Sequence, residues 1–221
     1  MQKEIAIISL GMSCQTAHQL RVNQPMLEKY GIPAGAVFSN YFDWLICPPN
    51  SAAHLLESGM PRFTRDDITL KAQPFWNDYE LYFWHEFRNN NIVDIDEHFE
   101  FAQQKFDYLR EKFSKLRHYK RLVCILSNTQ GNLPQVHDET GELDFIFDDA
   151  KIQRLKTALE NYLSRNVEIL VVTNKDRFEG SAGKGYEIEF MDNDETEWKG
   201  DDNAWENCLK RYFVGNLNHR K

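Results

Sequence analysis

Nearly continuous apolar runs alternate with amphipathic helical patterns along this chain, most clearly in its second half. Three such runs, Ile5–Leu10, Arg121–Leu126 and Val167–Thr173, contain few polar residues, and Tyr186–Phe190 is a further strand-like run. Strands of this composition are usually buried on both faces, as in a parallel sheet. The pattern therefore predicts four strands, with the N-terminal one in the same sheet as the others.

Helical periodicity separates these strands. One helix is predicted over Ala150–Ser164, with Asp148 or Asp149 as its N-cap. Another is predicted over Asn203–Val214. A longer one is predicted between residues 94 and 119, where apolar residues recur at spacings of three and four. Its apolar positions are Phe99, Ala102, Phe106, Leu109, Phe113 and Leu116. A coiled-coil seam has the same spacing, but a short aromatic run favours a helix lying on a sheet.

The order of these elements predicts the fold class. Strand, helix, strand, helix and strand in succession favour right-handed crossovers between parallel strands. We therefore expect an α/β fold in three layers, a mostly parallel sheet with helices on both faces. Residues 1–221 are expected to form a single α/β domain. Residues 25–87, approximately, interrupt the alternation and are predicted to be an aromatic-rich insertion or cap over the sheet.

The N-terminal half has weaker signals. A short helix is predicted over Ser13–Val22 with Ser13 as its N-cap, and another over Ser51–Ser58. The connection "RVNQPMLEKYGIPAG" is polar and rich in turn residues, and the prolines of "CPPN" are expected to end any regular element there. The aromatic segment Ile68–Arg88 is predicted to form one or two strands with a turn near "WND".

Composition and charge exclude several functional classes. Of the 221 residues 42% are hydrophobic, enough for a core, and the formal net charge is -8. This acidic balance disfavours non-specific nucleic-acid binding and docking on an anionic membrane, since both need basic surfaces. No apolar run is as long as a membrane span, and the N-terminus lacks a signal-peptide pattern. We expect a cytoplasmic protein with neither nucleic acid nor membrane as partner.

The cysteines are dispersed along the chain. Cys14, Cys47, Cys124 and Cys208 form no CxxC pair, which disfavours a zinc site and predicts four free thiols in a reducing compartment. Cys124 and Cys208 lie within predicted core elements and are expected to be packing residues. No other ligand cluster indicates a metal, and neither a metal nor a cofactor is expected.

Four loops are expected to meet at one edge of the sheet, because ligand crevices form at the carboxyl ends of parallel strands. These loops are "GMSC", "SNTQGN", "NKDR" and "DNDETE". The first of them places Cys14 on the first turn of a helix, where the N–H groups and the helix dipole lower a thiol pKa. Gly11 and Ser13 would hold an anion or oxyanion there. The alternative is that Cys14 is a small residue filling a tight junction.

A thiol enzyme also needs a base. His85, in "YFWHEF", is the best candidate among seven histidines because it ends a strand-like run. His18 lies one helical turn after Cys14 and is a weaker candidate, since a histidine there is commonly solvated or packed.

Three further side chains are candidates to orient an imidazole: Asp43, Asn128 and Glu86. Turn, capping or solvated roles are more common for such residues. Asp43 lies between aromatic residues in "FDWL", so its carboxylate needs a partner. It would face the site, anchor the Cys14 loop or cap a local turn.

Three motifs in this chain resemble a bacterial family of unknown function described as papain-like cysteine peptidases. The resemblance covers roughly the first half of the chain, and the motifs are moderately specific only together. It implies a Cys14–His85 pair, with Asp43 or Asn128 as a third member. Papain-like folds place the histidine on an antiparallel sheet, whereas the periodicity here predicts a parallel one, which we follow for the fold. The matching positions are Ser9, Leu10, Gly11 and Cys14, then Leu20 and Arg21, then Phe42, Asp43 and Trp44, then His85, Glu86 and Phe87.

Three functional hypotheses follow. The first is a cysteine-dependent hydrolase or acyltransferase acting on a small molecule or a peptide, with Cys14 as nucleophile and His85 as base. The second is a binding protein or transferase for a small anionic ligand such as a nucleotide-sugar, with Arg21 or Lys175 nearby and a structural Cys14. The third is an interaction protein that uses the exposed part of the aromatic segment Phe75–Phe87.

Overall fold

A four-stranded parallel sheet forms the centre of the protein. The computed structural model describes residues 3–141, 143–181, 185–192 and 198–215. The sheet order is β1-β7-β9-β11, so strands adjacent in the sheet follow each other in the chain, and all three pairings are parallel. The predicted α/β fold is thereby confirmed. The strands are β1 (Lys3–Ser9), β7 (Tyr119–Ser127), β9 (Glu168–Thr173) and β11 (Glu187–Phe190).

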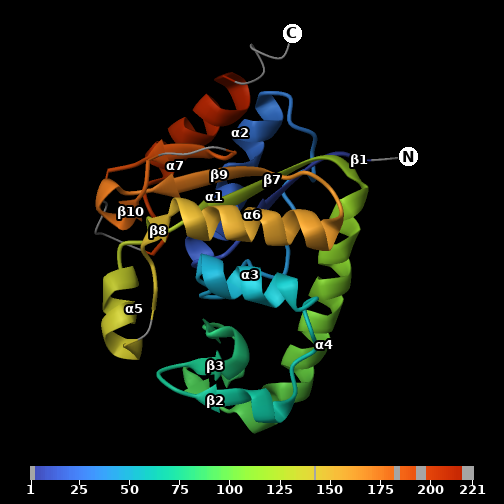
Figure 1. Cartoon of the computed structure of the whole chain (residues 1–221), viewed down its shortest axis with the longest axis vertical. Helices are drawn as coiled ribbons and strands as arrows, with labels where there is room; N and C mark the ends of the chain where they lie inside the picture. The colour runs from blue at the N-terminus through green and yellow to red at the C-terminus, as the bar shows by residue number, and fades with distance from the viewer. Residues whose placement is uncertain (1–2, 142, 182–184, 193–197, 216–221) are drawn as a thin grey trace.

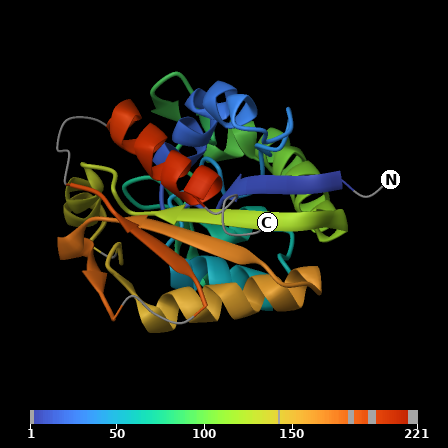
Figure 2. The ribbon, with the colours of Figure 1, turned by 90° about the horizontal axis from the view of Figure 1, so that it is seen from above.

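Helices cover both faces of this sheet, as Figure 2 shows from above. One face carries α1 (Cys14–Val22), α2 (Gln24–Lys29) and α7 (Asp202–Lys210), and the other carries α3 (Pro49–Glu57) and α6 (Asp149–Leu163). Because successive strand residues point to opposite faces, Ile7 joins the core beneath α1 and α7, whereas Ile8 joins the core beneath α3 and α6. The predicted three layers are present.

The segment between β1 and β7 extends the core beneath α3 and α6 away from the sheet. Helix α4 (Ile95–Ser114) runs along the side of the molecule, from the small strands at the bottom of Figure 1 up to β7. Its predicted stripe is partly buried, with Phe106 and Phe113 in the core. The small strands are β2 (Ile68–Leu70), β3 (Pro74–Trp76) and β4 (Leu81–Tyr82), which pair antiparallel, and β5 (Arg88–Asn89) with β6 (Ile92–Val93).

The remaining elements are short. Helix α5 (Leu133–Thr140) follows β7, and a short parallel pair joins β8 (Phe147–Asp148) to β10 (Phe178–Glu179). Helix α7 continues as one π-helical turn over Arg211–Gly215. The 3-10 turns are Arg65–Asp67, Asn77–Tyr79, Lys115–His118 and Lys175–Arg177.

The aromatic segment is an interior packing element. Phe75, Trp76, Phe83 and Phe87 are all 3% exposed or less. Phe63 lies at the centre of the cluster, with its ring centroid 5.3 Å from that of Phe83. The segment therefore offers little of the exposed aromatic surface that the interaction-protein hypothesis requires.

Two boundary predictions are wrong in the N-terminal half, and one helix was not predicted near the middle. The connection after Arg21 contains α2, the third helix of the chain begins at Pro49 after Pro48, and α5 follows the "SNTQGN" loop. All three helices carry a proline in their first turn. A proline there loses only an N–H that has no intrahelical partner, so it starts a helix instead of ending one.

Within the described residues, no helix is both long enough and apolar enough to cross a bilayer.

Candidate functional site

A tight left-handed turn carries Cys14 from the sheet edge to the start of a helix. After β1, Gly11 and Met12 have φ angles of 81° and 64°, and Ser13 is extended before α1 begins at Cys14. The predicted N-cap position of Ser13 is confirmed, but its hydroxyl makes no capping hydrogen bond. The N–H of Gly11 donates to the Ser9 hydroxyl, so it is not free to hold an oxyanion. Any oxyanion site would use the first N–H groups of α1.

Gly11 is required by both its conformation and its surroundings. A Cβ at this position would lie 3.4 Å from the Phe42 carbonyl oxygen, in addition to the strain of the left-handed region. We expect Gly11→Ala to lower the free energy of unfolding by about 1–3 kcal/mol, measured by urea denaturation. Gly59 is the matched control because its φ is 77° and nothing lies within 4 Å of its added Cβ. Equal losses in Gly11→Ala and Gly59→Ala would show that the close approach to Phe42 does not matter.

Two backbone contacts bring His85 toward this turn. The N–H of Met12 donates to the Cys47 carbonyl at 3.1 Å, which ties the turn to the segment that contains Trp44. Ile46 and Tyr82 then exchange backbone hydrogen bonds of 3.1 and 2.9 Å. These contacts place the end of the aromatic segment, including His85, beside the segment that flanks Cys14.

Cys14 and His85 line one pocket. Its volume is about 140 Å³. Cys14 is partly buried and His85 is exposed on the pocket rim. Three indoles also line it, from Trp44, Trp84 and Trp198. The pocket thus contains both members of the predicted pair, although Cys14 and His85 are far apart in the sequence.

The opposite wall of the pocket is the loop after β7. Gln130 and Asn132 line the pocket, and the Gln130 amide oxygen lies 3.8 Å from the Cys14 sulfur. The Gln130 amide nitrogen donates to the Asn132 side-chain oxygen at 2.6 Å. This loop is "SNTQGN", one of the four expected at the sheet edge.

Burial controls the resting charge of the pair. It raises the pKa of the Cys14 thiol to about 11, more than the thiol's own backbone N–H lowers it. The expected lowering by the helix N-terminus is therefore wrong for the resting protein, because desolvation is larger. Desolvation also lowers the pKa of His85, Arg88 lowers it further, and Glu86 acts in the opposite direction. At neutral pH a neutral thiol and a neutral imidazole line the same pocket.

Asp43 lies outside the pocket and holds Arg21 in place. Its buried carboxylate accepts hydrogen bonds from Arg21 at 2.8 Å and from the Asn40 amide at 2.7 Å. The Arg21 guanidinium lies 4.8 Å from the centroid of the Trp44 ring, and Trp44 meets His85 edge-to-face at 5.6 Å. Asp43 therefore reaches the histidine only through Arg21 and Trp44, and it does not hydrogen-bond the imidazole directly as the prediction requires.

The same contacts connect the Cys14 turn to Asp43. Asn40 donates to the Ser9 carbonyl at 3.0 Å and to Asp43, so it links the end of β1 to the "FDWL" motif. Of the three roles considered for Asp43, anchoring of the Cys14 loop agrees best with these distances.

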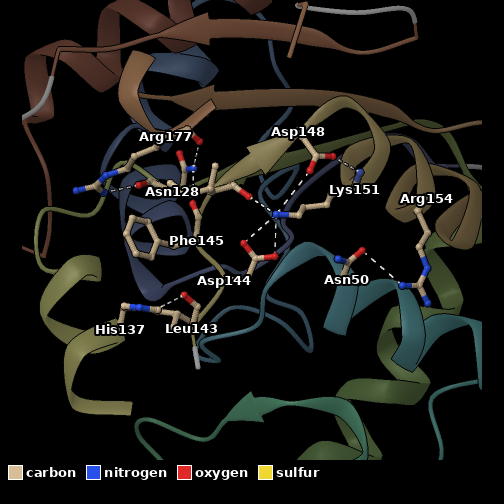
Figure 3. Close-up of polar contacts among 11 residues, drawn as sticks. Asn50, Asn128, His137, Leu143, Asp144, Phe145, Asp148, Lys151, Arg154 and Arg177 are labelled. Carbon is tan, nitrogen blue, oxygen red and sulfur yellow. Dashed lines mark hydrogen bonds and ion pairs between the residues drawn. The ribbon is translucent and has the colours of Figure 1, made fainter. Parts of the chain in front are cut away.

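Asn128 is committed to a structural network, shown in Figure 3. Its amide nitrogen donates to the carbonyls of Phe145 and Arg177 at 2.8 and 2.9 Å. Arg177, only 3% exposed, donates in return to the carbonyls of Asn128 and Gln130 at 2.6 and 2.7 Å. Asn128 therefore does not line the pocket, and its predicted role as a third catalytic member has no geometric support.

The other charged candidates are also engaged elsewhere. Glu86 is buried and bonded to Lys105. His18 packs its ring 5.1 Å from Trp198, and burial is the main cause that lowers its pKa. Within the part of the chain that the structure describes, no side chain hydrogen-bonds the His85 ring. The His85 imidazole is thus oriented by packing against Trp44.

Sequence reasoning missed the indoles of the pocket. Trp44 and Trp84 stand inside motifs already singled out, beside Asp43 and His85, and that adjacency was the available signal. Trp198 follows the loop "DNDETE", of which residues 193–197 lie outside the described residues. Trp198 lines the pocket although it stands shortly before α7, far from Cys14 and His85 in the sequence.

Within the residues that the structure describes, no group of three or more His, Cys, Asp or Glu side chains is arranged to hold a metal ion. Comparison with protein-family models, with curated proteins and with solved structures returned no match for this chain.

Proposed function

We propose that this protein is a cysteine-dependent hydrolase or acyltransferase in which Cys14 is the nucleophile and His85 the base. The observation that carries the proposal is that both side chains line one pocket at the carboxyl edge of the sheet. Ligand crevices of parallel α/β sheets form at this edge. The resemblance of the surrounding motifs to papain-like cysteine peptidases supports the same pairing.

The chemistry proceeds in two acyl transfers. The Cys14 sulfur attacks a carbonyl carbon while the His85 imidazole takes the thiol proton, so no thiolate has to exist beforehand. The carbonyl oxygen becomes an oxyanion that the first N–H groups of α1 stabilise. The intermediate collapses to a thioester, and the leaving amine or alcohol takes the proton from the imidazolium. Water or an acceptor alcohol or amine then attacks the thioester and regenerates the thiol.

A neutral resting pair suits this general-base route. The Cys14 pKa of about 11 leaves the thiol protonated at neutral pH. Partial desolvation and the nearby Arg88 lower the pKa of His85, which favours the unprotonated imidazole that can accept a proton. Four free cysteines fit a reducing location, so cytoplasmic placement belongs to the same proposal.

The second hypothesis, an anionic-ligand site with a structural Cys14, is less well supported. It needs a free cation at the start of α1. Arg21 is instead paired with the buried Asp43 carboxylate, and Lys175 is exposed and is not among the pocket residues. An anion in this pocket would have no counter-charge from either residue.

The proposal is tested by the pH profile of Cys14 alkylation by iodoacetamide. Cys47, Cys124 and Cys208 are fully buried, so labelling at Cys14 can be followed by peptide mass spectrometry in the unmodified chain. With a working base, the rate should already be high near neutral pH and should change little above the His85 pKa. His85→Ala should lose about tenfold or more at about pH 7 and rise steadily with pH instead.

His118→Ala is the matched control. His118 is exposed in the turn before β7, at the opposite end of that strand from the pocket. Its variant should keep the wild-type profile. If His85→Ala and His118→Ala give the same profile as the wild type, His85 is not the base and Cys14 is a structural thiol.

A further inference from the structure

Among the residues that the structure describes, those lining the Cys14 pocket carry no formal charge. Three are indoles, from Trp44, Trp84 and Trp198, three are aliphatic, and the polar positions are the amides Gln130 and Asn132 beside Cys14 and His85. No lysine, arginine, aspartate or glutamate is among these lining residues. An apolar pocket with a few polar groups of this kind is typical of sites that enclose an uncharged group.

Several charged side chains near the pocket are engaged within the protein, and Arg88, which acts on His85, donates to the Gln73 amide oxygen. Arg21, over Trp44, is paired with Asp43 at 2.8 Å. Glu86 is bonded to Lys105, and Arg177 spends its Nη1 on two backbone carbonyls. The thiol and both nearby imidazoles are neutral at pH 7 for the reasons given above. A charged ligand would therefore meet no charged side chain among the described lining residues, and its desolvation would be costly.

Size sets a second limit. The pocket volume of about 140 Å³ is close to that of a cavity, about 150 Å³, that accommodates a benzene molecule. One aromatic ring or a short branched acyl chain fits that volume, and a nucleotide does not. Flat indole walls favour a planar aromatic group, since aromatic pairs add to the free energy of burial.

A hydrogen-bond donor is also present at the rim. Asn132 is exposed and uses its side-chain oxygen to accept from Gln130. Its amide nitrogen is thus open to an acceptor oxygen on the ligand. An uncharged carbonyl group supplies that oxygen.

We propose that the pocket binds the acyl part of an uncharged amide or ester whose acyl group is aromatic or short and apolar, and that it excludes anionic groups of the same shape. This inference names the substrate class of the proposed function and rests on it for the reaction. The binding itself does not depend on the thiol, so the two can fail separately.

The test uses benzamide, benzoate and benzamidine, which share one ring and differ in charge. Their binding to the Cys14→Ala variant is measured by calorimetry and tryptophan fluorescence, where no thiol chemistry contributes. Benzamide should bind at least about tenfold more tightly than benzoate and more tightly than benzamidine. It should also protect Cys14 of the unmodified protein from iodoacetamide. Tighter binding of either charged probe, equal binding of all three, or no binding would overturn the inference.

A variant with one added negative charge locates the probes. Asn132→Asp keeps the shape of the side chain and remains suitable for the N-cap position, immediately before α5. The added carboxylate should shift the ranking toward benzamidine and weaken benzoate further. Asn91→Asp, at an exposed position that is not among the pocket residues, should leave the ranking unchanged. Identical rankings in both variants would mean that the probes bind elsewhere, which contradicts the proposal.

The outcomes also separate the two proposals. Selective benzamide binding with His85-independent alkylation would leave the ligand class standing and remove the catalytic pair. His85-dependent alkylation without selective benzamide binding would leave the catalytic pair and remove the ligand class.

Discussion

Replacing Arg177 with methionine is expected to lower the free energy of unfolding by about 2–5 kcal/mol, the largest stability loss that we predict. Arg177 is 3% exposed and donates to the carbonyls of Asn128 and Gln130 at 2.6 and 2.7 Å. Both acceptor residues are themselves buried. Methionine fills much of the same volume but donates no hydrogen bond, so two buried carbonyls would lose a charged donor at about 1–3 kcal/mol each.

The measurement is urea denaturation of the variant beside Arg154→Met. Arg154 is also drawn in Figure 3, with its hydrogen bond to Asn50. Its ion pair is with Glu57, at 2.7 Å. Because this pair is solvent-exposed, its loss should cost about 1 kcal/mol or less. Arg177→Lys keeps the charge but not the planar fork and should fall between the two. Equal effects at Arg177 and Arg154 would show that the buried contacts contribute nothing special.

A pocket readout separates stability from site geometry in the same variants. Gln130 lines the pocket and receives one of the two Arg177 hydrogen bonds. Loosening that loop should weaken benzamide protection of Cys14 under conditions in which the Arg177→Met protein is still folded. Arg154→Met should keep full protection, because Arg154 is not among the pocket residues.

The central sheet could be predicted from the sequence because double-sided burial leaves a clear composition. Ile7, Cys124 and Val171 are fully buried, and each lies in an apolar run that predicted its strand. The strands β7, β9 and β11 follow one another through comparatively short connections, as adjacent strands commonly do, whereas residues 10–118 separate β1 from β7. Such signals are local, so a single sequence is enough to identify them.

Helices that begin with a proline were harder to predict: α2 and α5 were missed, and α3 was predicted to begin at Ser51, two residues too late. Pro25, Pro49 and Pro134 each stand in the first turn of a helix, where the sequence reasoning expected a turn, a stop or a loop. A proline at the beginning and one in the middle of a helix look alike in the sequence. The distinction depends on whether the preceding N–H groups already lack partners, which the tertiary structure decides.

The site was predictable only in part, and for a physical reason. Cys14 follows from a local strand–turn–helix pattern, whereas the approach of His85 depends on the Ile46–Tyr82 pairing across the chain. The role of Asp43 depends on Arg21, which binds it from another segment. The motifs in the sequence could indicate that these residues belong to a site, but not which of their side chains would be in contact.

Asp43 provides the second large prediction, which concerns how stability varies with pH. Its side chain is 5% exposed, and burial raises its pKa to about 6, although Arg21 acts in the opposite direction. An unfolded aspartate titrates near about 3.9. Between these two values the folded protein holds the proton more tightly than the unfolded chain does. Raising the pH through this range therefore lowers the stability that Asp43 contributes.

The expected result is that the stability of the wild type relative to Asp43→Asn falls by about 2–3 kcal/mol between about pH 4 and about pH 7, since each pKa unit is worth about 1.4 kcal/mol. Urea unfolding of both proteins across that range measures it. Asp144→Asn is the control, because Asp144 has a side-chain exposure of 45% and its replacement should give a difference that varies far less. A wild-type advantage that grows with pH would reverse the sign. It would mean that attraction to Arg21 exceeds the cost of burying the carboxylate, and that the link from Asp43 through Arg21 and Trp44 to His85 is strongest with Asp43 ionised.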